Sequence, residues 1–336
     1  MSDTTVARSD EPVELDARLE RHRSELTGYC YRMLGSAFEA EDAVQETLIR
    51  AWKGFDRFEG RSAVRSWLYR IATNVCLDML GGSQRRARPM DLGPASAAST
   101  PVGTPLVEST WILPIPDSRV VPVEGDPADL AVSRDTIRLA FVAALQHLPP
   151  RQRAVLILRE VLAWSASEVA ELLETTVASV NSALQRARAT LASVEASDTD
   201  VLQPMDEAQR ELLDRYVDAF QRYDMVSLTA LLHEDATMNM PPLNYWVRGH
   251  ADIAEFMLGQ GHECRGSRLV PVEAANGTAA WGQYKPGGPD GSFTPWALVM
   301  VEVSGDRIAG LNFFLDTGLL FPLFGLPPRL DPEPVG

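Results

Sequence analysis

The stretch that decides the fold is LPPRQRAVLILREVLAWSASEVAELLETTVASVNSALQRARATL, residues 148–191. Ser165 and Glu168 have the spacing of a capping box at the start of a short amphipathic helix. Residues 174–176 then turn the chain into a second helix with its own apolar stripe. That stripe is formed by Val180, Leu184, Ala187 and Leu191. Two helices joined by a tight turn are the pattern of a helix-turn-helix, whose second helix enters the major groove of DNA.

The other face of the second helix is polar and carries side chains suited to reading base edges. Arginine and glutamine can hydrogen-bond purines bidentately, and serine or asparagine adapts to either partner. The candidate base readers are Ser179, Asn181, Ser182, Gln185 and Arg186. Arg188, with either Arg151 or Arg153, is expected to contact backbone phosphate, which positions a protein without reading sequence. An ordinary solvated helix face is the alternative.

A separate helical block precedes this motif, between residues 15 and 82. Apolar residues recur there at helical spacing in three segments, the last of which ends at Gly81-Gly82. The middle segment starts with a capping box formed by Ser36 and Glu39, and its outward side is acidic and polar. The side chains on that side are Glu39, Glu41, Asp42, Gln45 and Glu46. Three packed helices are therefore expected.

Charge is distributed unevenly along the chain. A net charge of -15 argues against a protein that simply coats nucleic acid. Residues 61–88 nevertheless hold six arginines and one acidic residue, Asp78, so they form a local basic strip. For the arginines at its end, Arg85, Arg86 and Arg88, two interpretations stay open, contact with phosphate or solubilisation of the following segment.

Composition divides the rest of the chain into segments. Residues 1–14 are polar and expected to be disordered, and residues 83–126, rich in Pro, Ala, Ser and Gly, are typical of a linker. The linker contains an apolar island, TWILPIP, residues 110–116, whose exposure to water would be costly. The island residues expected to dock on a folded surface are Trp111, Leu113 and Pro114. The helical block with the helix-turn-helix covers residues 127–195.

The C-terminal part has a different pattern, one amphipathic helix followed by hairpins. Asn276-Gly277 and Ser304-Gly305-Asp306 are turn sequences flanked by strand-forming runs. Helices followed by hairpins predict a separate α+β domain over residues 204–327, with 328–336 as a tail.

The helical motifs resemble the extracytoplasmic-function (ECF) sigma factors of bacterial RNA polymerase. YRMLGSAFEAEDAVQETLIRAW, residues 31–52, and RSWLYRIATNVCLDML, residues 65–80, are similar to region 2 of that family, and residues 148–191 to region 4. The C-terminal part resembles the SnoaL-like, or NTF2-like, cone, in which helices pack inside a bent antiparallel sheet. The chain as a whole looks like SigG- and SigJ-like members, and FLDTGLLFPLFGLP, residues 314–327, is similar to the tail of SigG-type members. The implied fold is multidomain: two all-α domains, sigma-2 and sigma-4, followed by an α+β cone-shaped domain.

The resemblance implies a promoter-specificity subunit with no membrane association, acting in the cytoplasm. Its partners would be promoter DNA and the polymerase core, with the acidic side of the 36–52 helix on the β′ clamp helices and further contact at the β flap. The helix-turn-helix would read the -35 element. The residues implied to hold the melted strand of the -10 element are Arg61, Arg65, Arg70 and Asn74. The appended domain is expected to regulate in cis, with no separate anti-sigma factor.

Two further classes of function stay open for the C-terminal domain. His233, Asp235, His250 and Asp316 could line the cone as acid-base groups of an enzyme. Alternatively, the cavity could bind a small-molecule ligand without converting it, as in a sensor. Neither a metal nor a cofactor is expected, because His262-Glu263-Cys264 lacks the spacing of a tetrahedral site and the odd number of cysteines fits free thiols. A fold by itself does not decide between these alternatives.

Overall fold

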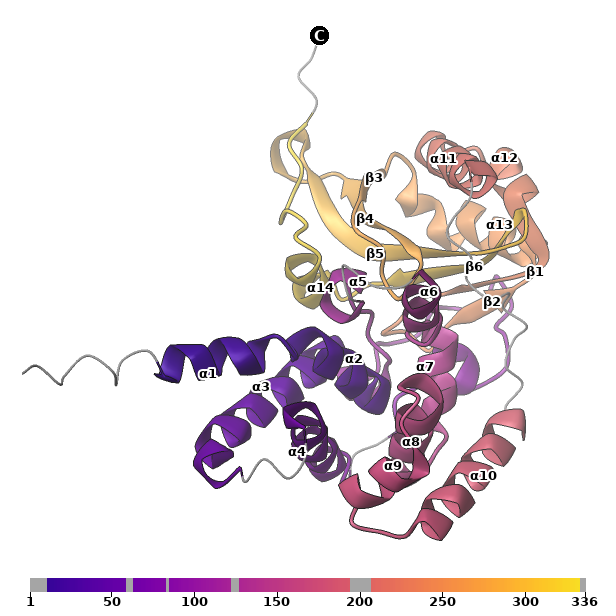
Figure 1. The fold of residues 1–336 in the computed structure, drawn as a ribbon. Helices are drawn as coiled ribbons and strands as arrows, with labels where there is room; N and C mark the ends of the chain where they lie inside the picture. The colour runs from indigo at the N-terminus through magenta and orange to yellow at the C-terminus, as the bar shows by residue number, and fades with distance from the viewer. Residues whose placement is uncertain (1–10, 59–62, 83–84, 122–126, 194–206, 333–336) are drawn as a thin grey trace, which may run out of the picture. The chain divides into compact units, whose positions relative to one another are not determined.

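The computed structural model describes residues 11–58, 63–82, 85–121, 127–193 and 207–332 (Figure 1). The chain divides into two compact units. One consists of Met1–Arg86 and Ile112–Ser197, and the other of Ala87–Trp111 and Asp198–Gly336. The segment expected to be a linker is thus shared between the two units, and each unit is described by itself below.

The helical unit begins with the block predicted for residues 15–82. Its elements are α1 (Glu11–Glu20), α2 (Arg23–Leu34), α3 (Ala37–Gly54), the 3-10 turn η1 (Phe55–Arg57) and α4 (Val64–Met79). α2 ends at Gly35, whose φ of 75° favours glycine, and the next residue, Ser36, caps α3. α1 starts at Glu11, inside the segment expected to be disordered, while residues 1–10 lie outside the described residues.

The same unit contains the block with the helix-turn-helix. Its elements are α5 (Asp117–Val120), α6 (Pro127–Asp135), α7 (Leu139–Gln146), α8 (Pro150–Leu156), a π-helical turn (Ile157–Val161), α9 (Ala166–Leu172) and α10 (Val177–Ser193). The two helical blocks pack against each other through α2, α4, α7, α8 and α9. Their apolar faces therefore form a shared core.

The α+β unit is a mixed sheet of six strands among the described residues, in the order β2-β1-β6-β5-β4-β3. The strands are β1 (Leu232–Asn239), β2 (Trp246–Arg248), β3 (Arg268–Pro271), β4 (Ala279–Pro286), β5 (Phe293–Ser304) and β6 (Arg307–Phe314). Both predicted hairpins are present, and Asn276 and Gly277 adopt φ of 52° and 71°, as their turn requires. The expectation of an antiparallel sheet was wrong at one place, because β1 runs parallel to β6.

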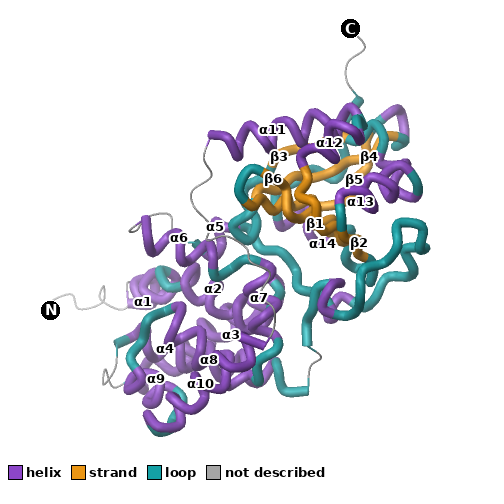
Figure 2. The backbone as a smooth tube through the Cα atoms, turned by 90° about the vertical axis from the view of Figure 1, so that its right-hand side faces the viewer, coloured by secondary structure: helices purple, strands orange, loops and turns teal. Residues whose placement is uncertain are grey.

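Helices cover this sheet and close its core. Figure 2 shows α11 (Glu207–Arg222), α12 (Met225–Leu231) and α13 (His250–Leu258) gathered around the strands. The remaining elements are α14 (Thr317–Leu323) and the 3-10 turns η2 (Pro89–Asp91), η3 (Glu108–Thr110), η5 (Gln260–Cys264) and η6 (Pro289–Gly291). One apolar core joins α11, α12 and α13 to the inner faces of the strands.

Residues 87–111 do not form a free linker but a strap that is fixed to the α+β unit. Ala98 is part of its apolar core. The main chain of Ser96 donates a hydrogen bond to the carbonyl of Trp246 over 2.8 Å, and that of Leu106 donates to Pro242 over 2.9 Å. Gln260 Nε2 donates to the carbonyls of Ala98 and Thr100, each over 2.8 Å. Because the strap is held mainly through its backbone, its side chains show no periodic pattern.

Candidate promoter and polymerase interface

The helix-turn-helix is built as the sequence predicts. Both bonds of the capping box are formed, Glu168 N to Ser165 Oγ over 3.2 Å and Ser165 N to Glu168 Oε2 over 2.7 Å. The hydrogen bonds that the Glu168 carboxylate accepts from the Ser165 hydroxyl and the Ser165 main-chain N–H lower the pKa of that carboxyl, because they favour its charged form. α10 buries Val180, Leu184 and Ala187. α10 therefore packs through its apolar face and leaves its polar face exposed.

All candidate base readers on α10 are exposed. They are Ser179, Asn181, Ser182, Gln185 and Arg186. Ser179 also serves the start of the helix, since its hydroxyl lies 2.9 Å from that of Thr176 and its main-chain N–H donates to Thr176 Oγ1 over 3.1 Å. Arg188 is exposed and pairs with Glu160 at 2.6 Å. The predicted roles of these residues in reading DNA stay predictions.

One of the two arginines considered for phosphate contact is excluded. Arg153 is only 3% exposed and donates to Gln146 Oε1 over 2.6 Å, to the Leu148 carbonyl over 3.2 Å and to the Met33 carbonyl. Burial lowers its pKa to about 10. Arg153 thus ties the two helical blocks together, and the exposed Arg151 is the remaining candidate.

The candidates for the -10 element lie on or near α4, and two of them contact the second helical block. Arg65 Nε donates to Glu25 Oε2 over 2.7 Å, and its guanidinium lies 5.4 Å from the ring centroid of Trp164. Arg70 lies 3.8 Å from a carboxylate oxygen of Glu171 in α9. Asn74 is exposed, and Arg61 lies outside the described residues.

An aromatic cluster lies at the start of α4, where the sequence favoured a core position for Trp67 over a role as a stacking platform. The ring centroid of Trp67 lies 4.9 Å from that of Phe58 and 6.2 Å from that of Phe55. Trp67 and Phe58 are half-buried, so parts of their rings are accessible beside the basic strip. The three aromatic residues are spaced irregularly, and no helical period relates them. Aromatic rings with accessible faces are the kind of surface on which unpaired bases can stack.

The predicted polymerase-binding face of α3 is present but largely paired within the chain. Glu39 binds Arg86 at 2.7 Å, Glu41 binds Arg119 at 2.6 Å, and Glu46 binds Arg50 at 2.7 Å, while Asp42 and Gln45 are exposed. The pairing of Glu39 explains why its carboxylate does not close the predicted capping box with Ser36.

Two exposed apolar residues on α3 extend this face. Ile49 is 39% and Trp52 54% exposed, and both line a shallow groove of α1 and α3 together with Gln45 and Leu19. The sequence reasoning assigned only the charged and polar positions. An exposed tryptophan within a helical stripe was the signal for a binding surface, because such residues favour interfaces over water.

Each arginine at the end of the basic strip has a partner within its own unit. Arg85 donates to His147 Nδ1 over 2.7 Å, Arg86 binds Glu39, and Arg88 pairs with Asp91 at 3.1 Å. Arg86 is 5% exposed. For Arg86, neither interpretation made from the sequence holds, because a buried guanidinium neither reaches phosphate nor adds solubility.

The apolar island of the linker is buried. Trp111 is 1% and Leu113 4% exposed, and Pro114 is also buried. Within the helical unit, Leu113 N donates to the Gly35 carbonyl over 3.0 Å, and the Tyr31 hydroxyl donates to the Leu113 carbonyl over 2.9 Å. In the α+β unit, Trp111 forms an isolated bridge with Ala87.

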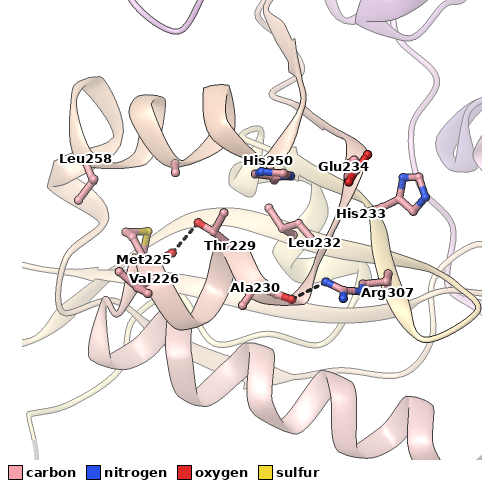
Figure 3. A pocket seen from close by; sticks show the side chains of 11 residues that line it. Met225, Val226, Thr229, Ala230, Leu232, His233, Glu234, His250, Leu258 and Arg307 are labelled. Carbon is pink, nitrogen blue, oxygen red and sulfur yellow. Dashed lines mark hydrogen bonds between the residues drawn. The ribbon is translucent and has the colours of Figure 1, made fainter.

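The four residues considered for an enzyme do not converge. His233 and His250 line an open groove of about 670 Å³, where the ring of His233 points away from His250 (Figure 3). Asp235 pairs with Arg248 at 3.3 Å. Asp316 precedes α14 and lines neither this groove nor the inner cavity of the cone. Among the described residues, no group of three or more His, Cys, Asp or Glu could hold a metal ion.

Comparison with known proteins identifies the family. The family models for Sigma-70 region 2, Sigma-70 region 4 and the SnoaL-like domain match residues 19–86, 138–191 and 213–311. The chain is 43% identical over 320 residues to the ECF RNA polymerase sigma factor SigG of Mycobacterium tuberculosis (strain CDC 1551 / Oshkosh), covering 94% of this chain and 85% of that protein. The chain belongs to the ECF sigma factors. Its helical unit therefore contains sigma-2 and sigma-4, and its α+β unit contains the SnoaL-like domain.

A second relative shares this architecture. The ECF sigma factor SigJ of Mycobacterium tuberculosis (strain ATCC 25618 / H37Rv) is 28% identical over 250 residues, which cover 72% of each protein. The crystal structure of SigJ covers 94% of this chain and 100% of its own, with a TM-score of 0.57 at 22% identity. The SigJ structure thus shows the same fold.

The expectation of no separate anti-sigma factor is withdrawn. A solved structure of the sigma factor RpoE in complex with the anti-sigma factor NepR from Bartonella quintana covers 56% of this chain, at 21% identity and a TM-score of 0.33. That sigma factor has a separate protein partner, whereas the expectation for this chain was that it has none. None of the described helices has the length and hydropathy of a membrane span.

Proposed function

We propose that this ECF sigma factor reads the -35 element with the exposed face of α10 and the -10 element with α4, and that its SnoaL-like domain regulates both steps in cis. The binding face of α3 would hold the polymerase core in the cytoplasm, where that enzyme works. The chain itself would carry out no chemistry, since its relatives are named as sigma factors. The observation that carries the proposal is the strap, which joins the two DNA-reading modules and is held by the SnoaL-like domain.

The helical unit has the geometry of a closed state. Arg65 and Arg70 contact Trp164 and Glu171 of sigma-4, and a DNA strand bound along α4 would have to replace these contacts. Exposed ion pairs contribute only about 0–1 kcal/mol, and cation-π contacts contribute about 0.5–2 kcal/mol. These polar contacts are therefore weak, and the apolar contacts between the two helical blocks are what the polymerase core would have to replace in opening the unit.

The strap limits how far the modules can separate. A free Gly- and Ser-rich segment samples many end-to-end distances, whereas Ala87–Trp111 is held by hydrogen bonds along its length. One of these is donated by Trp246 Nε1 to the carbonyl of Gly93 over 3.0 Å. Releasing the strap would lengthen the flexible connection between sigma-2 and sigma-4.

Run-off transcription with core polymerase tests the proposal. A chain truncated after Ser193 should differ from the full-length chain in promoter preference and core affinity. Gln260→Leu in the full-length chain should shift activity in the same direction, because it removes both strap bonds of that side chain. Gln209→Leu, which changes a half-buried glutamine of α11 that donates to the Gly305 carbonyl, is the matched control. Unchanged promoter response and core affinity after truncation would refute regulation in cis.

A further inference from the structure

The SnoaL-like domain encloses a small cavity that promoter recognition does not use. Its volume is about 230 Å³, at the lower end of the size of small-molecule sites. The walls are mainly thioether and aromatic side chains. They include Met238, Met240, Met257, Phe256, Phe313 and Trp296. Methionine side chains adapt to ligands of different shape, so this lining favours a compact apolar molecule.

One cationic side chain lines this cavity. Lys285 Nζ lies 3.2 Å from the ring centroid of Trp296, and the side chain is only 12% exposed. Its carboxylate neighbour, Glu263, lies at 3.4 Å and is 69% exposed. A charge removed from water requires a partner of opposite sign, and Glu263, which also lines the cavity, supplies one that is mostly hydrated and that an entering anion could replace. The lysine is therefore placed to bind an anion that enters the cavity.

The strap completes the wall of this cavity. Val102 is one of the lining residues, and the neighbouring Ala98 is buried in the core of the domain. Gln260, which also lines the cavity, holds the strap carbonyls of Ala98 and Thr100. A molecule in the cavity would therefore contact both the domain and the segment that joins sigma-2 to sigma-4.

We propose that this cavity binds a compact apolar carboxylic acid, with the carboxylate on Lys285 and the apolar body between the methionine and aromatic walls, under Val102. Glu263 can turn into water to make room, since its side chain is mostly exposed. Occupancy then tightens the hold of the domain on the strap. This last step rests on the proposed regulation in cis, whereas binding itself does not.

Lysine acetylation of the free full-length chain measures the binding directly. The chain has two lysines, so exposed Lys53 in α3 is an internal control for Lys285. Octanoate and phenylacetate serve as flexible and aromatic probes, and octanol and phenylethanol as uncharged analogues. At a probe concentration about ten times Kd, acetylation of Lys285 should slow about tenfold, in proportion to the free fraction, while Lys53 is unaffected. No protection by either acid, or equal protection of both lysines, would overturn the proposal.

Two pairs of variants separate the carboxylate and the strap contributions by calorimetry. Lys285→Met should weaken binding of the acid at least about tenfold and leave the uncharged analogue unchanged, whereas Lys53→Met should match the parent chain.

Val102→Asp should weaken binding of the acid, because it places a second negative charge in the wall. Val107→Asp, on the same strap but 66% exposed, should not. Val102→Ala keeps the test valid if the aspartate variant fails to fold. Parent-like affinity in Lys285→Met would also refute the proposal. Since no polymerase is present, these results are independent of the transcription assay.

Discussion

The arginines of sigma-4 and the basic strip fall into two groups, one buried and one exposed. Arg153 is buried among carbonyl groups, whereas Arg151, two residues earlier, is exposed. Arg86 is buried against Glu39, whereas Arg186 on α10 is exposed. A guanidinium can donate five hydrogen bonds, so one residue type can serve both as an internal tie and as the predicted DNA contact. Position in the packed unit decides which role each arginine takes.

Arg186→Ala should relax specificity at one or two bases of the -35 element. Loss of a bidentate base contact costs roughly 1–3 kcal/mol against the preferred base and little against others. Arg188→Ala is the matched control, since a phosphate contact weakens binding similarly on every sequence. Binding of the polymerase holoenzyme to a library of -35 variants measures both. Equal loss on all sequences for Arg186→Ala would make it a backbone contact.

Arg153→Met should destabilise the helical unit by about 2–4 kcal/mol. The substitution leaves several buried carbonyls without a donor, and each unsatisfied group costs about 1–3 kcal/mol. Arg151→Met, which changes an exposed residue of the same helix, should fall within about 0.5 kcal/mol of the parent. Thermal and urea unfolding give these differences. Similar stability of the two variants would contradict the tying role of Arg153.

At the scale of elements, the contact between α4 and the start of α9 decides whether the surface proposed to read the -10 element is covered. Trp164 precedes α9, is 6% exposed, and packs its ring 5.1 Å from that of Tyr69 in α4. The ion pair of Arg70 and Glu171 lies farther out, where water screens it. Aromatic packing, and not the ion pair, therefore holds the two elements together.

Trp164→Ala should loosen this contact, while Glu171→Gln should leave it nearly intact. Removing a buried tryptophan costs about 3–5 kcal/mol, and an exposed ion pair contributes about 0–1 kcal/mol. Amide hydrogen exchange of α4 and α9 should accelerate in Trp164→Ala alone, and this variant should bind single-stranded -10 DNA more tightly than the parent. Parent-like exchange in Trp164→Ala, or faster exchange in Glu171→Gln, would show that other contacts close the unit.

At the scale of the whole molecule, the strap would let an acidic domain influence the surfaces proposed to read DNA. From residue 201 onward the chain has 18 acidic and 9 basic residues, so the SnoaL-like domain adds to the negative charge. Long-range repulsion from DNA phosphate follows from this charge and is screened by salt. The domain would thus discourage DNA binding until the polymerase core is present.

A chain truncated after Ser193 should therefore bind promoter duplex more tightly than the full-length chain when polymerase is absent. The difference should be largest at low ionic strength and shrink as salt rises, because repulsion is screened. Fluorescence anisotropy at several salt concentrations measures it. A difference that persists at high salt would point to steric cover instead of charge, and equal affinity at low salt would exclude both.

The sequence by itself determined the elements and the family. Capping boxes, helical stripes and Asn-Gly turns act over a few residues, so the recognition helix, the hairpins of the cone and the exposed face of α10 could be predicted. The DNA and polymerase contacts assigned to these faces remain predictions.

Tertiary structure alone decided the strap, the parallel pairing of β1 with β6, the burial of Arg153 and the cavity around Lys285. Each depends on partners far apart in the chain: Gln260 holds residue 98, and Arg153 reaches Met33. Main-chain hydrogen bonds and close packing create these features, and neither leaves a periodic trace in the order of amino acids.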